Sequence, residues 1–184
     1  MREHKLKAQI GYKRRHITGG KPSKVADNLL ARQFNPPKPN QIWVSDITYI
    51  RTYEGFLYVV TVMDLFSRRI VGWSMDKCMD KHLVIKALLM AVYQRRPSSE
   101  VMVHSDQGSQ YGSADYLAFL KEHNLTPSMS RRGNCHDNAV AESFFATIKK
   151  RIIRKKIYST RNDAKAEIFN FIEMFYNPKK RHSH

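Results

Sequence analysis

Residues 42 to 50 read Ile42-Trp43-Val44-Ser45-Asp46-Ile47-Thr48-Tyr49-Ile50, and this stretch decides how the chain folds. β-Branched and aromatic residues fill it, without proline or glycine, so we expect a strand. Alternation along a strand puts Asp46 on one face with Val44 and Ile50, in a row that is otherwise largely apolar. A carboxylate there must be ion-paired, protonated or bound to a metal, because burying it alone is costly.

Two further strands follow closely in the sequence. The first runs from Phe56 to Leu65 and the second from Ile70 to Met75. Glu54-Gly55 precedes the first strand, and Ser67-Arg68-Arg69 separates the two. Links this short join antiparallel neighbours, so the sequence predicts a three-stranded antiparallel meander.

A helix then leads to a fourth strand. Apolar residues recur at helical spacing from Leu83 to Val92, and Arg95-Arg96-Pro97 ends the pattern. Residues 100–104 are expected to form a short buried strand, which Ser105-Asp106-Gln107-Gly108 breaks with turn residues. Asp106 therefore lies at the carboxyl end of a strand, where open α/β sheets usually hold ligands and metals.

The rest of the chain is expected to be mostly helical. We predict a helix over 114–123, a strand over 125–129, a helix over about 137–156 and a helix over 160–176. Glu142 lies early in the third of these elements, five residues after Asp137, which we expect to cap that helix. Thr160 is the expected cap of the last helix, and Asn177-Pro178 is expected to stop it.

Basic residues are concentrated at the two ends of the chain. The 184 residues carry a formal net charge of +16, with 32 Lys and Arg against 16 Asp and Glu. Residues 1–39 hold 10 basic and 2 acidic side chains and residues 143–184 hold 11 and 3, whereas residues 40–142 balance at 11 against 11. A neutral centre between two basic arms suits an enzyme that acts on a polyanion such as DNA. A merely solvated surface, or one that binds RNA or membranes, is the alternative.

No apolar run approaches the ~20 residues of a membrane span, and no signal-type apolar region follows Met1. We therefore expect a cytoplasmic, nucleoid-associated protein without membrane contact. Glycine, proline and lysine are frequent in residues 1–39, which indicates a basic arm and linker with a short helical possibility at 25–32.

Three acids stand out, although each has an ordinary explanation when taken alone. Asp46 could form a salt bridge with Arg51 or Arg68. Asp106 could simply form a turn, and Glu142, which follows it after 35 intervening residues, could be a solvated acid on a helix. Carboxylates from separate segments can, however, converge on a pair of divalent cations and support phosphodiester chemistry.

Three segments carry a resemblance to a known family. They are Trp43-Val44-Ser45-Asp46-Ile47-Thr48-Tyr49, Val103-His104-Ser105-Asp106-Gln107-Gly108-Ser109-Gln110-Tyr111 and Gly133-Asn134-Cys135-His136-Asp137-Asn138-Ala139-Val140-Ala141-Glu142-Ser143-Phe144-Phe145. They strongly resemble bacterial insertion-sequence transposases with a retroviral-integrase-like catalytic core, the second-reading-frame product of a two-frame insertion sequence. The similarity runs from about Asn40 to the end and includes Phe175-Tyr176-Asn177-Pro178.

The resemblance implies both a fold and an activity. The implied fold is α/β, with a ribonuclease-H-like mixed sheet of three antiparallel strands followed by parallel strands, flanked by helices. The implied enzyme is a Mg-dependent DDE transposase in which Asp46, Asp106 and Glu142 are catalytic and bind two Mg²⁺ ions, with Mn²⁺ as a substitute. Water first frees a 3′-hydroxyl at the element end, and that hydroxyl then attacks a target phosphodiester.

Five basic residues are candidate DNA contacts. Lys149 follows Glu142 by seven residues, or two helical turns, so we expect both side chains on one helix face. The basic run around it is expected to follow the phosphate backbone, with plain solvent exposure as the alternative. The candidates are Lys149, Lys150, Arg131, Arg132 and Arg154.

The resemblance also divides the chain and implies partners. Residues 1–39 are the arm and linker, 40–158 the integrase-like catalytic core, and 159–184 a C-terminal helix and basic tail that is shorter than in the family. Expected partners are DNA, as element ends and target, a second copy or higher assembly, and a helix-turn-helix companion protein from an upstream frame. A truncated DNA-binding relic or inhibitor without activity, and a nuclease of the same fold, are the alternative functions.

Overall fold

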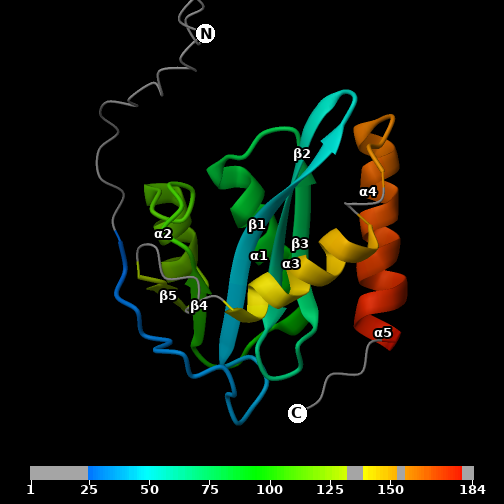
Figure 1. Cartoon of the computed structure of the whole chain (residues 1–184). Coiled ribbons are helices and arrows are strands. Elements are labelled where there is room, and N and C mark those ends of the chain that lie inside the picture. The colour runs from blue at the N-terminus through cyan, green and yellow to red at the C-terminus, as the bar shows by residue number, and fades with distance from the viewer. Residues whose placement is uncertain (1–24, 132–138, 153–155, 180–184) are drawn as a thin grey trace, which may run out of the picture.

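The computed structural model describes residues 25–131, 139–152 and 156–179, which are built around one five-stranded sheet (Figure 1). The strands lie in the order β3-β2-β1-β4-β5. β1, β2 and β3 pair antiparallel, whereas β4 runs parallel to β1 and β5 parallel to β4. The mixed α/β sheet predicted from the sequence is confirmed. Its strands are β1 (Ile42–Thr52), β2 (Gly55–Asp64), β3 (Ile70–Asp76), β4 (Val101–Ser105) and β5 (Leu125–Met129).

Helices cover both faces of this sheet. They are α1 (Lys81–Arg95), α2 (Ala114–Glu122), α3 (Ala139–Arg151), α4 (Arg161–Phe169), the π-helix η3 (Asn170–Tyr176) and α5 (Asn177–Lys179). Helices α1 and α2 share a core with Trp43 and Val60, whereas α3, α4 and η3 share a second core with Ile50 and Val59. Figure 1 shows α3 crossing the sheet on the side where α4 lies. No helix in the described parts of the chain is long and apolar enough to cross a bilayer.

Small residues let α1 pack directly on the backbone of β3. A Cβ added to Gly72 would lie 2.1 Å from the carbonyl oxygen of Ala87 and 2.9 Å from Cβ of Ala91, so only glycine allows this approach. Gln110 Nε2, in the loop that follows β4, donates to the carbonyl of Met79 (3.2 Å), just before α1. This hydrogen bond connects the loop that carries Asp106 to the segment before α1.

The segment before the sheet lies along the edge strand β5. The N–H of Met129 donates to the carbonyl of Asp27 (3.2 Å), and those of Leu29 and Leu30 donate to Ser128 Oγ (3.0 and 3.2 Å). The short helix considered for this segment is wrong, because its N–H groups bond to β5 rather than to a helical turn. This segment therefore covers an edge that would otherwise be open.

The C-terminal helical segment begins as predicted but ends differently. Thr160 and Asp163 form a capping box at the start of α4, which confirms Thr160 as the cap. The predicted stop at Asn177-Pro178 is wrong, because the chain passes through η3 and continues into α5. Asn177 instead turns its side chain to the edge strand: Ile70 N–H donates to Asn177 Oδ1 (2.9 Å) and Asn177 Nδ2 donates to the carbonyl of Ile70 (3.0 Å).

Candidate active site

The parallel pairing of β1 with β4 brings Asp46 toward Asp106. The last pair in this register is Val44 with His104, an offset of 60 (104 − 44). Continuing that offset by two residues places Asp46 opposite Asp106. Neighbouring strands lie about 4.8 Å apart, so two carboxylates at this level are close enough to share a cation.

The turn after β4 shapes the position of Asp106. Gly108 N–H donates to Asp106 Oδ1 (3.0 Å), and Tyr111 N–H donates to the carbonyl of Gly108 (3.0 Å). The Asp106 side chain is exposed, whereas Asp46 is half-buried and its Oδ1 accepts the N–H of Ile47 (2.8 Å). The turn that could have explained Asp106 is present, and it leaves the carboxylate open to solvent.

A buried hydroxyl pair lies close to both aspartates. Tyr111 and Ser45 are each 0% exposed, and Tyr111 Oη lies 3.0 Å from Ser45 Oγ. Burial raises the pKa of Tyr111 well above its usual range, and the charges of Asp46 and, less strongly, Asp106 raise it further. Both carboxylates therefore lie near this one hydroxyl.

Sequence reasoning assigned no role to Ser45 or Tyr111. Each lies in a segment that carries the family resemblance, next to Asp46 or five residues after Asp106. That proximity was the only signal in the sequence, because nothing local shows that two residues 66 positions apart form a hydrogen bond.

Arg68, considered as a salt-bridge partner for Asp46, binds the segment before the sheet. Its Nη2 donates to the carbonyl of Phe34 (3.0 Å) and to Asn35 Oδ1 (2.9 Å). Burial lowers the pKa of Arg68, while Tyr176 and Asp64 act in the opposite direction. The contacts of this guanidinium thus join the Phe34 region to the sheet.

Helix α3 brings Glu142 over the sheet face that Asp46 shares. Phe144, Phe145 and Ile148 of α3 are buried in one core with Ile50 of β1, and alternation puts Ile50 and Asp46 on the same face. Glu142 lies within α3, three residues from its first residue. Its side chain is outside the described part of the chain, so the position of the carboxylate itself stays a prediction.

The donor set suits a hard divalent cation. Carboxylate oxygens are the ligands that Mg²⁺ and Mn²⁺ prefer, and the exposure of Asp106 leaves room for a cation and a phosphate. Among the side chains that the structure describes, no three His, Cys, Asp or Glu residues form a metal-binding group. The third ligand would be Glu142 on α3.

The candidate DNA contacts are only partly described. Lys149 and Lys150 are exposed near the end of α3, and Arg131 is exposed just after β5. Lys149 lies seven residues from Glu142, about 10.5 Å along a helix. Arg132 and Arg154 lie outside the described residues. The exposed lysines are therefore available to phosphates beside the helix that carries Glu142.

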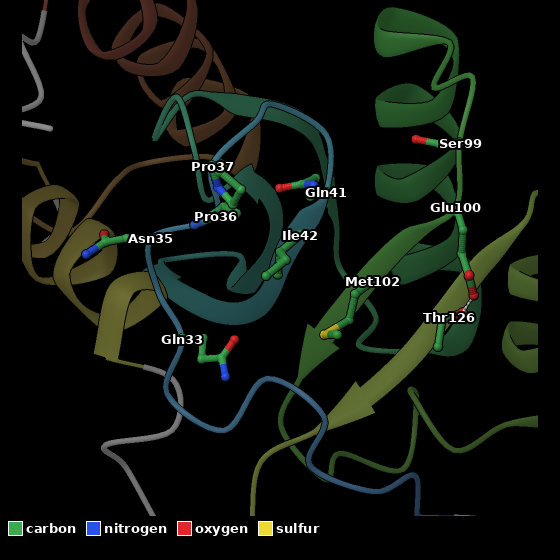
Figure 2. A pocket seen from close by; sticks show the side chains of 10 residues that line it. All are labelled: Gln33, Asn35, Pro36, Pro37, Gln41, Ile42, Ser99, Glu100, Met102 and Thr126. Carbon is green, nitrogen blue, oxygen red and sulfur yellow. Dashed lines mark hydrogen bonds between the residues drawn. The ribbon is translucent and has the colours of Figure 1, made fainter.

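A cavity of about 600 Å³ lies toward the opposite end of the strands (Figure 2). Ile42, Met102 and Thr126 line it, all at or near the first residues of β1, β4 and β5. Glu100 is the one charged residue among the described residues that line it, and an acid repels phosphate. This cavity contains neither aspartate and is separate from the candidate active site.

Comparison with solved structures defines the class of fold. The catalytic core domain of HTLV-2 integrase, in complex with magnesium, superposes with a TM-score of 0.59 and 17% sequence identity, covering 78% of this chain and 93% of that one. A chain of the simian T-cell lymphotropic virus intasome gives a TM-score of 0.66 at 18% identity, covering 82% and 52%. The fold is ribonuclease-H-like, as in retroviral integrase cores.

Sequence comparison makes the assignment more specific. An integrase core domain family matches residues 36–135, and a second family of the same description matches residues 123–184. Transposase InsF for insertion sequence IS3A of Escherichia coli is 48% identical over 159 residues, which are 86% of this chain and 55% of InsF. The transposase for insertion sequence element IS904 of Lactococcus lactis is 43% identical over 172 residues, 94% of this chain and 68% of that protein. The chain belongs to the IS3 family of transposases with an integrase core domain, and it spans about half the length of InsF.

Proposed function

We propose that this chain carries a site that cuts DNA at the ends of an insertion sequence and joins those ends to a target. Asp46, Asp106 and Glu142 are the proposed catalytic and metal-binding residues. The observation that supports the proposal is the register of β1 with β4, because its continuation by two residues would set Asp46 opposite Asp106, on a sheet that α3 covers. InsF and the transposase for IS904 support it as relatives, and the magnesium complex of the HTLV-2 integrase core supports the choice of metal.

Bound Mg²⁺, or Mn²⁺ in its place, would activate the attacking oxygen and stabilise the leaving oxygen. The chain's own residues hold the carboxylates still: β1 fixes Asp46, and the turn closed by Gly108 fixes Asp106. Water attacks the phosphodiester at the element end and frees a 3′-hydroxyl, which then attacks a target phosphodiester. Each attack replaces one P–O bond by another, so strand joining needs no external energy source and no protein nucleophile.

The proposal includes partners beyond the catalytic site. Lys149 and Lys150 on α3, with Arg131, Arg132 and Arg154, would hold phosphates of the DNA. Two element ends must be held together, so we propose a dimer or higher assembly. A helix-turn-helix companion would recognise the ends, in a nucleoid-associated complex.

Strand cleavage and transfer on duplex oligonucleotides with the element's own terminal repeats test the proposal. With Mg²⁺, the wild-type chain together with its companion should nick and join these ends. Asp106→Asn and Glu142→Gln should lower the rate at least a thousandfold, because several kcal/mol of transition-state stabilisation depend on the metal ligands. Glu122→Gln, which changes an exposed helical acid on α2, is the matched control and should retain the wild-type rate.

The alternative functions give different results in the same assay. Salt-sensitive DNA binding without metal-dependent cleavage would indicate a DNA-binding relic. Cleavage of RNA in hybrids, but never of DNA ends, would indicate a nuclease of the same fold. If Glu142→Gln cleaves DNA at the wild-type rate, Glu142 is not part of the catalytic site.

A further inference from the structure

The hydroxyl pair formed by Tyr111 and Ser45 connects the two segments that carry the aspartates. Ser45 precedes Asp46 in β1, and Tyr111 lies five residues after Asp106 in the loop between β4 and α2. Both side chains are 0% exposed, and their oxygens are 3.0 Å apart. Such a buried hydrogen bond is not weakened by competing water, so it fixes one segment against the other.

This hydrogen bond lies just beyond the end of the backbone pairing between β1 and β4. The backbone ladder between β1 and β4 ends at Val44 and His104, two residues before the aspartates. The hydrogen bonds of Gly108 shape the turn internally but do not reach β1. The hydrogen bond between Ser45 and Tyr111 therefore joins β1 to the loop after β4 in the region beyond the last backbone pair.

Two carboxylates that converge repel one another until a cation arrives, so the free protein must hold them together by other means. We propose that Tyr111 is a positioning residue which, through Ser45, keeps Asp46 and Asp106 at a separation that binds metal. This inference rests on the proposed function. Burial and both carboxylates raise the pKa of Tyr111, which keeps its hydroxyl protonated and able to act as a neutral partner.

Tyr116 provides a comparison within the same core. It is 1% exposed, and its ring meets that of Tyr111 edge to face at 5.5 Å. Its hydroxyl has no hydrogen-bond partner among the described residues, whereas that of Tyr111 bonds to Ser45. If Tyr111 only filled space, the loss of either hydroxyl would have the same small effect.

Titration of the purified full chain with Mn²⁺, followed by the paramagnetic resonance signal of the free ion, tests the inference without requiring activity. The Mn²⁺ binding that is lost in Asp46→Asn is the binding at the proposed site. Tyr111→Phe and Ser45→Ala should each weaken that binding about tenfold to a hundredfold, the usual effect of removing a group that supports metal ligands. Tyr116→Phe should bind Mn²⁺ as the wild type does.

The double variant Tyr111→Phe/Ser45→Ala should bind no more weakly than the weaker single variant, because both changes break the same hydrogen bond. Wild-type affinity in Tyr111→Phe, or equal losses in Tyr111→Phe and Tyr116→Phe, would overturn the positioning role and leave the proposed function standing. If Asp46→Asn binds Mn²⁺ as tightly as the wild-type chain does, both the proposed site and this inference fail. Thermal unfolding of each variant without metal separates lost folding from lost positioning.

Discussion

Gly108 shows how a single residue can set the geometry of the site. Its N–H donates to Asp106 Oδ1, and a Cβ added to it would lie 3.0 Å from that same oxygen and 3.0 Å from Gln110 Oε1. Both contacts are tighter than ordinary van der Waals distances. The absence of a side chain at Gly108 therefore allows the Asp106 carboxylate to fold back over the turn.

We predict that Gly108→Ala impairs the site more than the fold. The methyl group should push the Asp106 carboxylate aside by a few tenths of an ångström, and such displacements of catalytic groups lower rates by about tenfold to a hundredfold. Strand-cleavage rates and thermal midpoints should be measured together. A fall in thermal midpoint that fully accounts for the lost activity would contradict this prediction.

Among the elements, the C-terminal helices are held on the edge of the sheet by side-chain hydrogen bonds. The Asn177 side chain bonds both the N–H and the carbonyl of Ile70, at the first residue of the edge strand β3. Trp73 Nε1 adds a bond from the same strand to Glu173 Oε1 (2.7 Å). Asn177, in a segment that carries the family resemblance, thus has a structural explanation in holding η3 and α5 on the edge of the sheet.

Asn177→Ala should destabilise the protein by about 1–3 kcal/mol, because it leaves two half-buried backbone groups of Ile70 without their partner. Asn177→Asp should lose at least as much, since its second carboxylate oxygen would face the Ile70 carbonyl, which needs a donor. Chemical denaturation measures the change. Asn162→Ala on α4, where the side chain is exposed, is the control, and equal losses at both positions would contradict the role of Asn177.

At the scale of the whole molecule, each face of the sheet carries a large apolar core in the part of the chain that the structure describes, and both of these cores contain buried tyrosines. Tyr111 and Tyr116 lie in the core under α1 and α2, whereas Tyr176 lies in the core under α3 and α4. Burial raises the pKa of Tyr116, and it raises the pKa of Tyr176 to about 12 against the opposing charge of Arg68. Folding therefore keeps these phenols protonated where an unfolded chain would ionise them.

This difference predicts loss of stability at alkaline pH. Unfolded tyrosines ionise near pH 10, so between pH 10 and about 12 the folded chain holds a proton on Tyr176 that the unfolded chain has lost. Below pH 10 the contribution of Tyr176 to stability is fully present. Between pH 10 and about 12 the free energy of unfolding falls by about 1.4 kcal/mol per pH unit.

Urea denaturation from pH 8 to 12 tests the direction. Tyr176→Phe should show a shallower decline above pH 10 than the wild type. Tyr93→Phe, which changes an exposed side chain on α1, is the control and should leave the slope as it is. Identical slopes in Tyr176→Phe and the wild type would contradict the prediction.

Local sequence patterns predicted most of the secondary structure. The β-branched run at 42–50 formed β1, and Thr160 capped α4, because such preferences act between residues close in the chain. Residues 25–32 did not form a helix, because Ser128 and Met129 of a distant strand bind their backbone. A helix passing through Asn177-Pro178 was equally unpredictable, since Asn177 is oriented by Ile70.

The sequence by itself determined the order of strands and helices, the basic ends, and the segments in which Asp46, Asp106 and Glu142 lie. Only the tertiary structure decided the register of β1 with β4, whose continuation by two residues sets Asp46 opposite Asp106, because these two strands are distant in the chain. It also decided that Tyr111 reaches Ser45 beneath them. Alternation and helical periodicity describe one element at a time, whereas a metal site depends on how several elements pack together.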